Sequence, residues 1–366
     1  MRNEDGSDYA DSEPFVGTGE ATPADLDYRM PAEWRPHRAT WLSWPHNVET
    51  WPGKFETVEP AMDRVARVLA ETELVYINAR SDKALRDLEQ RFEGVDRIRV
   101  CLIPTNDAWI RDHGATFVSK ADEDAPVGER VAAVDWRYNA WGGKYPPWDL
   151  DDEVPRAMAD FLGVPCFRSP LHCEGGALEV DGEGLLMTTA SCLLNPNRNP
   201  AWSQPEVEKH LRAMLGVDEF IWLPGTELAG DDTDGHIDNL ARFVGDGVVL
   251  VGACVDADDE NGVATDLNLE YLRKWRSQTG SAFDVRELPL PRALYYNARR
   301  LPASYANFYI ANDVVIVPTY GQPDRDDAAI QIIGEHFPGR GVAGIDCTDL
   351  IWGLGAFHCL TQQVPA

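Results

Sequence analysis

The sequence repeats one structural unit at a nearly constant spacing. Each copy has a short apolar run, a turn and a second apolar run, which is the pattern of a β-hairpin. Three copies are clear, at residues 177–189, 240–251 and 308–317. Their turn residues Asp181, Asp246 and Asn312 are 65 and 66 positions apart. A fixed period of this length predicts a repeat architecture, and this restricts the fold more than any other feature of the chain.

The segments around these hairpins alternate between helix and strand patterns. Helical periodicity follows the three copies at residues 205–215, 267–279 and 326–336, and a weaker fourth hairpin begins at residues 115–118. Nearer the N-terminus, helical spacing between Val58 and Phe92 surrounds a strand-like run at residues 74–78. Further strand-like runs occupy residues 40–44 and 98–103. This alternation predicts an α/β protein.

Five units of this length would occupy about 325 residues, nearly the whole span from residue 30 to the C-terminus. We therefore expect five α/β units in a closed ring. The C-terminal segment would complete the first unit, which residues 40–44 begin. Residues 1–28 are acidic and aperiodic, so they predict a disordered tail, whereas residues 29–366 predict a single domain.

Composition argues against several classes of protein. Seven scattered cysteines without a CxxC pair do not fit a disulfide framework or a zinc knuckle. We find no secretory signal pattern and no apolar run of membrane-spanning length, and expect a cytoplasmic protein without membrane contact. The net charge of -28 argues against nucleic acid and would attract a small cationic substrate. Solubility or adaptation to salt also explains this acidity, so charge alone does not decide the function.

The C-terminal segment is unusual, because chain ends are commonly polar and frayed. Residues 352–363 are largely apolar, contain two glycines and carry Cys359 beside His358. Phe357 and Leu360 alternate with polar positions as in a half-buried strand. We interpret this segment as a strand that presents Cys359 to a pocket. A C-terminal strand with an inert buried thiol is the alternative.

Polar residues stand at or just before the first strand of several units. They are Asp112, Glu174, His236 with Asp238, and Cys359. If the units are related by rotation, these five residues would share one central site. Each of them has an ordinary explanation when taken alone, such as an aspartate in a turn.

The five side chains form a chemically coherent set. A thiol reacts as the thiolate, and His236 could lower its pKa and transfer protons. Glu174 would orient that histidine. Asp112 and Asp238 exceed what the hydrolysis of an amide or ester requires, and paired buried carboxylates favour a planar guanidinium group. We expect no metal and no cofactor, although cysteine, histidine and carboxylate ligands leave zinc open.

Seven short segments resemble the guanidino-group modifying (pentein) superfamily, and within it the agmatine deiminase and porphyromonas-type peptidylarginine deiminase family. They are MPAEW at 30–34, TWLSWPH at 40–46, NDAWIRD at 106–112, YNAWGGK at 138–144, EGG at 174–176, DTDGHID at 232–238 and HCLTQQ at 358–363. They occur in the order of the family and cover residues 30–366, so they are highly specific for it.

The resemblance implies a pseudo-symmetric five-bladed α/β propeller, the pentein fold. It implies Cys359 as the nucleophile, His236 as general acid and base, and Glu174 on that histidine. Asp112 and Asp238 would hold the guanidinium group. Trp109 and Asp232 match positions associated with binding near the distal amine of the substrate, although agmatine-specific members often carry glutamate at the position of Asp232.

The resemblance further implies hydrolytic deimination through a covalent thiouronium on Cys359, with agmatine giving N-carbamoylputrescine and ammonia in polyamine metabolism. A peptidylarginine or free-arginine deiminase is the main alternative, and an amidinotransferase or a non-catalytic binding protein is a more distant one. The chain has Leu354 where the family commonly has a run of glycines, so we expect a narrower mouth. A homo-oligomer is left open.

Overall fold

Five sheets of the protein share one strand pattern. The structure is a computed structural model that describes residues 21–121, 126–225, 227–245 and 247–366. In each of these sheets the first strand runs antiparallel to the second, and the second runs parallel to the third. The first sheet carries one additional parallel strand. The expected α/β class is therefore confirmed, and so is the repetition of one unit.

The strands of the five sheets are given in the order in which they pair. The first sheet contains β18 (Gln362–Pro365), β1 (His37–Ser43), β2 (Leu74–Ala79) and β3 (Ile98–Leu102). The second contains β4 (Thr116–Ser119), β5 (Val131–Arg137) and β6 (Cys166–His172). The third contains β7 (Glu179–Val180), β8 (Leu185–Thr189) and β9 (Glu219–Leu223). The fourth contains β10 (Ala241–Gly245), β11 (Val248–Ala253) and β12 (Asp284–Pro289). The fifth contains β15 (Tyr309–Ile310), β16 (Val314–Thr319) and β17 (Gly341–Asp346).

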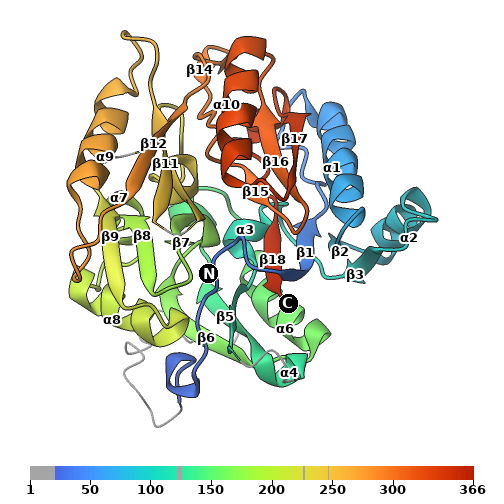
Figure 1. Ribbon diagram of the computed structural model, residues 1–366. Helices are drawn as coiled ribbons and strands as arrows, with labels where there is room; N and C mark the ends of the chain where they lie inside the picture. The colour runs from blue at the N-terminus through green and yellow to red at the C-terminus, as the bar shows by residue number, and fades with distance from the viewer. Residues whose placement is uncertain (1–20, 122–125, 226, 246) are drawn as a thin grey trace.

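A helix connects each pair of parallel strands, because parallel neighbours cannot be joined by a tight turn. These helices are α1 (Phe55–Ala70) and α2 (Asp82–Arg91) in the first unit, then α6 (Val154–Leu162), α8 (Gln204–Leu215), α9 (Gly262–Lys274) and α10 (Pro323–His336). Figure 1 shows α1, α6, α8, α9 and α10 around the outside of the molecule, with the sheets nearer its centre. The apolar faces of the helices and sheets form the core between them.

The local sequence explains how these helices begin and end. In α8, Ser203 and Glu206 form a reciprocal capping box at the N-terminus, and Gly216 ends the helix in the left-handed conformation. The predicted helices at 205–215 and 326–336 lie within α8 and α10. The helix predicted at 267–279 instead begins at Gly262 and ends at Lys274, because Trp275 has extended backbone angles.

The three predicted hairpins are present as the first two strands of the third, fourth and fifth sheets. In the first of these turns, the side chain of Asp181 accepts hydrogen bonds from the backbone of Glu183 and Leu185. The turn residue Asp246 lies outside the described residues. The weak fourth copy corresponds to β4, whose partner β5 follows only after a longer connection.

The two ends of the described chain lie in one sheet. Strand β18 pairs antiparallel with β1, with Thr40 opposite Gln363, so the C-terminus completes the first sheet as expected. Figure 1 shows the red β18 beside the blue β1. The predicted position of this strand was wrong, however. Phe357 to Leu360 form a turn, and the strand begins at Gln362. The alternation at 357–360 reflects burial of the whole turn, not a pleated strand.

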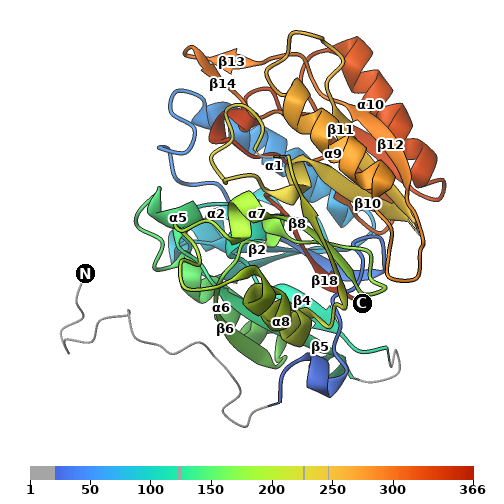
Figure 2. The ribbon, with the colours of Figure 1, turned by 90° about the vertical axis from the view of Figure 1, so that its left-hand side faces the viewer.

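Each unit contacts the next one, although hydrogen bonding closes no barrel among the described residues. The contacts are β18 with β4, α8 with β6, β7 with β10, α10 with β12, and α1 with β17. A separate two-stranded ribbon, β13 (Tyr295–Tyr296) and β14 (Arg299–Arg300), precedes the fifth sheet. Figure 2 shows it at one end of the molecule. The closed five-bladed propeller expected from the sequence is thus not itself a feature of the hydrogen-bonded sheets.

Part of the expected N-terminal tail has a defined structure. Residues 1–20 lie outside the described residues, but Ala24–Leu26 form a 3-10 helix and Tyr28 is buried. The phenol of Tyr28 donates a hydrogen bond to the backbone carbonyl of Glu129. The expectation of disorder up to residue 28 is therefore wrong for this part, because Tyr28 packs against the second and third units. Within the described ranges, no helix is long and apolar enough to cross a membrane.

Candidate active site

The predicted site residues occupy equivalent places in their units, in the short segment before the first strand. Asp112 lies in α3 (Ile110–His113) before β4, and Glu174 precedes the 3-10 helix Gly175–Ala177 before β7. His236 directly precedes another 3-10 helix, Ile237–Asn239, which contains Asp238 and leads to β10, and Cys359 lies just before β18. The first, second and third of these segments contact one another in turn. All five side chains are buried, as a shared central site requires.

His236 lies between two carboxylates. Its Nδ1 is 3.6 Å from Asp112 Oδ1, and its Nε2 is 3.8 Å from Glu174 Oε2. Gly176 permits this convergence, because a Cβ at that position would lie 2.5 Å from His236 Nδ1, 2.7 Å from Asp112 Oδ1 and 3.1 Å from Asp238 Oδ2. The same glycine donates its backbone N–H to Asp112 Oδ1 at 3.1 Å. The predicted partnership of Glu174 and His236 is thus consistent with the distances.

Cys359 lies between Asp238 and a residue that we did not predict. Its Sγ is 3.6 Å from Asp238 Oδ2 and accepts a hydrogen bond of 3.1 Å from Asn307 Nδ2. Asn307 Oδ1 also accepts the backbone N–H groups of His358 and Cys359, at 3.1 and 3.3 Å. The side chain of Asn307 therefore holds both the sulfur and the backbone of the turn. Asp238 Oδ1 is buried and has no hydrogen-bond partner among the described residues.

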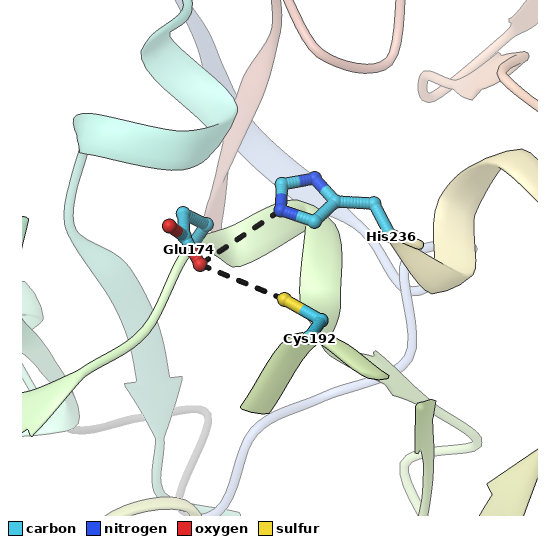
Figure 3. A group of neighbouring side chains, drawn as sticks. All are labelled: Glu174, Cys192 and His236. Atoms are coloured by element: carbon cyan, nitrogen blue, oxygen red, sulfur yellow. Dashed lines mark hydrogen bonds and ion pairs between the residues drawn. The ribbon is translucent and has the colours of Figure 1, made fainter. Parts of the chain in front are cut away.

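Glu174, Cys192 and His236 form a compact group with ligand atoms within 4.8 Å of one another (Figure 3). The thiol of Cys192, in α7 (Ala190–Leu193), donates to Glu174 Oε2 at 3.8 Å. These three atoms are of the kind that bind zinc. Arg198, however, donates to the other carboxylate oxygen at 2.7 Å, and its buried positive charge disfavours a second cation there. We therefore do not interpret these three residues as a zinc site. Glu174 and Cys192 instead surround the imidazole of His236.

Burial and neighbouring charges set the protonation of the site. Burial raises the pKa of Asp112 to about 6. Burial opposes the ionisation of Glu174, but Arg198 and His236 together outweigh it and lower the pKa of that carboxyl to about 2. Burial also opposes the charge of His236, yet Asp112, Cys192 and Glu174 together hold the pKa of the imidazole well above its usual value. A protonated histidine is therefore available as an acid.

The pKa values of the Cys359 thiol and of the Asp238 carboxyl are shifted in opposite directions. Burial, followed by the charges of Asp238 and Asp112, raises the pKa of the Cys359 thiol well above its usual value. Burial disfavours the ionised form of Asp238, but the hydrogen bond and charge of His358, together with the charges of His236 and Arg242, outweigh it and lower the pKa of this carboxyl. The site thus places the charges of two aspartates near the sulfur, and a cation bound there would counteract their effect on the pKa of the thiol.

A cavity of about 680 Å³ opens onto these groups. Asp112 and Cys359 line it, whereas Glu174, His236 and Asp238 are buried and do not belong to its lining. Trp109 and Asp232 also line the cavity, as the resemblance implied for residues that bind the substrate. Asp232 accepts hydrogen bonds from the phenol of Tyr145 and, through its backbone carbonyl, from Lys144.

The glycines and the leucine before Cys359 shape one wall of this cavity. A Cβ on Gly355 would lie 2.5 Å from the ring of Trp109, so only glycine permits the approach. Leu354 lines the same cavity and has a φ of 72°, in the left-handed region that disfavours most side chains. The side chain of Leu354 therefore forms part of this wall, and the narrower mouth stays a prediction.

Sequence reasoning missed several residues of the site. Asn307 stands directly before β15, so the repeat would have placed it in the site if the rule had been applied to the fifth unit. Trp141 donates to Asp112 Oδ2 at 3.0 Å and lies within the segment 138–144 that resembles the family, but it received no role. Arg198 and Cys192 lie after β8, where neither period nor spacing indicates a site.

Known proteins resemble the chain over nearly its whole length. Residues 29–365 match the family model of the Porphyromonas-type peptidyl-arginine deiminases. The chain belongs to this family. A provisionally named agmatine deiminase of Legionella pneumophila is 38% identical, with 94% of this chain and 96% of that protein covered. The agmatine deiminase of Medicago truncatula is 36% identical, with 95% and 99% covered.

A solved structure of the family also matches the fold. It is the agmatine deiminase of Enterococcus faecalis, which is 30% identical to this chain and superposes with a TM-score of 0.86. The match covers 97% of this chain and 99% of the other one. The mixed α/β architecture described above is therefore the architecture of this enzyme family.

Proposed function

We propose that the protein hydrolyses the guanidino group of agmatine to N-carbamoylputrescine and ammonia. Its family consists of hydrolases that act on guanidino carbon–nitrogen bonds. The observation that carries the proposal is the position of Cys359, with carboxylates near its sulfur in a cavity large enough for a small linear substrate. Agmatine is the substrate in the names of the relatives, and it has the cationic guanidino group that two buried carboxylates favour.

Binding is the first step of the proposed mechanism. The guanidinium group donates to Asp112, which lines the cavity, and reaches beyond the lining residues to the buried, unpartnered Oδ1 of Asp238, so that its carbon lies against Cys359 Sγ. Fixing the carbon beside the sulfur replaces a bimolecular encounter. The bound positive charge also counteracts the two carboxylates that raise the pKa of the thiol. The thiol proton is released as the substrate binds, and the thiolate forms where it is needed.

The chemical steps use His236 as acid and then as base. Cys359 Sγ forms a bond to the guanidinium carbon and gives a tetrahedral adduct. His236 protonates one nitrogen, which leaves as ammonia, and a covalent thiouronium remains on the sulfur. Neutral His236 then takes a proton from water, whose oxygen attacks the same carbon. The carbon–sulfur bond breaks, the ureido product leaves and the thiol is restored.

One observation favours arginine or an arginine peptide as a second candidate substrate. Arg80 lines the cavity and forms no hydrogen bond or ion pair with any described residue. The other cations of the cavity wall are engaged, since Lys144 pairs with Asp234 at 2.9 Å and Arg299 lies 3.8 Å from Asp232. A free guanidinium could therefore receive a substrate carboxylate, which agmatine lacks.

We also propose that the five units form the closed five-bladed propeller that the resemblance implied. The unit-to-unit contacts follow one cycle, and β18 joins the last segment of the chain to the first sheet. This arrangement would account for the equivalent places of the five site residues.

Ammonia release in the presence of a chelator tests the function. Purified protein is assayed with agmatine, free arginine and a blocked arginine peptide in parallel, with Cys359→Ala as the control. We expect turnover of agmatine and none by the variant. Turnover of arginine, lost in Arg80→Ala, would favour the second substrate. No release from any of the three would contradict the proposed function.

A further inference from the structure

A buried histidine outside the proposed mechanism lies between two carboxylates. His358 Nδ1 is 2.8 Å from Asp238 Oδ2, and His358 Nε2 is 2.8 Å from Glu33 Oε2. Each of these three side chains is less than a tenth exposed. Glu33 comes from the segment before β1, more than three hundred positions away in sequence. The chain thus brings its N-terminal and C-terminal segments together behind the site.

The geometry determines the protonation of this histidine. An ionised carboxylate only accepts hydrogen bonds, so a ring nitrogen at hydrogen-bond distance from it must carry a proton. Burial opposes the ionisation of Glu33, but Arg242, His358 and Arg111 hold the pKa of its carboxyl well below the usual value. The pKa of Asp238 is lowered as well, as described above. Because a carboxylate oxygen lies 2.8 Å from each ring nitrogen, the geometry favours an imidazolium that donates from both nitrogens.

Glu33 is fixed more firmly than a surface carboxylate could be. Its Oε1 accepts the backbone N–H of Ile310 at 2.8 Å and lies 3.0 Å from Arg242 Nη2. Its Oε2 is 3.5 Å from Arg111 Nη2. Arg111 in turn donates its backbone N–H to the carbonyl of Cys359 at 3.1 Å. The anchor of His358 and the backbone of the nucleophile therefore belong to one buried network.

We propose that Glu33 and His358 are positioning residues that hold Asp238 ionised and oriented, so that its free oxygen Oδ1 receives the substrate guanidinium. His358 occupies Oδ2 and leaves Oδ1, which has no other partner in the described chain. Without the imidazolium, Asp238 would lose the cation that is hydrogen-bonded to it, and the like charge of Asp112 disfavours the ionisation of both carboxyls. The inference rests on the proposed function, because it assigns Asp238 to a cationic substrate.

Agmatine binding to the inactive Cys359→Ala protein, measured by calorimetry between pH 6 and pH 9, tests the proposal. His358→Asn retains a donor for Asp238 but removes the positive charge. We expect roughly tenfold weaker binding near neutral pH, the loss of one charge-assisted hydrogen bond. We also expect this loss of affinity to become smaller as the pH rises, because Asp238 then ionises without the charge of His358. The other ionisable groups that face Asp238 stay unchanged in this comparison, namely His236, Asp112, Arg242 and Cys359 or its alanine.

Two further variants keep the test decisive. Glu33→Gln preserves volume and should give a smaller loss with the same dependence on pH, even if His358→Asn does not fold. His210→Asn is the matched control, since His210 is also buried but bonds to Ser169 at 2.8 Å, away from the site. It should leave binding unchanged. The proposal would be overturned if His358→Asn and Glu33→Gln bound agmatine as tightly as the Cys359→Ala protein does. It would also be overturned if the loss of affinity were equal at every pH. Failure of the wild-type protein to release ammonia from agmatine would instead overturn the proposed function.

Discussion

The thiol of Cys359 is protonated in the resting site, and this shapes the account at the scale of single residues. Burial and the two aspartates raise its pKa, so the nucleophile is generated when a cation arrives. Asn307, through its hydrogen bond of 3.1 Å to the sulfur, acts in the opposite direction and favours the thiolate. In the proposed mechanism, the carboxylates that receive the substrate therefore also keep the sulfur unreactive in its absence.

Because the pKa of Asp112 is raised, agmatine should bind more weakly as the pH falls. Burial raises it to about 6, so the carboxyl is neutral below that pH and binds a guanidinium poorly. Agmatine binding to Cys359→Ala should weaken by roughly tenfold for each pH unit below 6, because only the ionised form accepts the cation. Calorimetric titrations between pH 4.5 and pH 8 measure this.

Asp112→Asn in the same background is the control for this titration. It should bind weakly even at pH 8 and should lack the step near pH 6. Asp238 should add no step in this range, because its pKa is lowered. Affinity that is constant from pH 5 to pH 7 would contradict the assignment of Asp112 as a ligand of the cation.

At the scale of elements, the turns before the first strands carry the site, and the 3-10 helix Gly175–Ala177 is the most crowded of them. Gly176→Ala should reduce kcat/KM by at least about a hundredfold, because the added methyl group would overlap His236 and the two aspartates. The fold should persist, since the overlap is with side chains. Activity assays and circular dichroism measure the two effects separately.

Gly339→Ala provides the comparison for this variant. A Cβ there meets no atom within 4 Å, so activity should stay unchanged. Normal activity of Gly176→Ala would mean that His236, Asp112 and Asp238 do not need their observed convergence.

The sequence predicted elements that depend on local pattern, and failed where long-range pairing decides. The hairpins at 177–189 and 308–317 follow from apolar alternation and turn residues, and both are present. The strand at the C-terminus was predicted too early, because burial of the turn around Cys359 gives the same apolar pattern as a strand. Only pairing with β1 places the strand at Gln362.

For the candidate site, as for the elements, the sequence indicated the residues that follow from the repeat but not those that depend on long-range contacts. Five of its side chains followed from the repeat, since each precedes a first strand. His358 stood beside Cys359 in the sequence, but its contacts with Asp238 and Glu33 are long-range and have no sequence signal. The same holds for Arg198, whose partner Glu174 lies in another segment of its unit. Buried ion pairs require the fold to be known.

At the scale of the whole molecule, the net charge of -28 is a source of self-repulsion. Salt screens charges beyond a distance of about 10 Å at 0.1 M, so the folded state should gain stability when salt is added. We expect Tm to rise by several degrees between 0.05 and 1 M sodium chloride, measured by differential scanning fluorimetry, with about 2–4 °C for each kcal/mol.

Repeating this titration at about pH 5 is the control, because the net charge is small near the pI of about 4.5 and the repulsion should be small as well. A rise of the same size at both pH values would point to a general effect of salt on apolar burial. A fall in Tm at neutral pH would show that the surface ion pairs outweigh the repulsion.

Covalent catalysis by Cys359 is the central claim, and trapping the intermediate tests it most directly. The protein is mixed with agmatine, quenched in acid within the first turnovers and analysed by intact mass spectrometry followed by peptide mapping. The account predicts an adduct on Cys359 with the mass of agmatine minus one ammonia, absent from Cys359→Ala. An adduct that retains only the amidino group would indicate an amidinotransferase. Turnover without any adduct, or an active Cys359→Ala protein, would contradict the account.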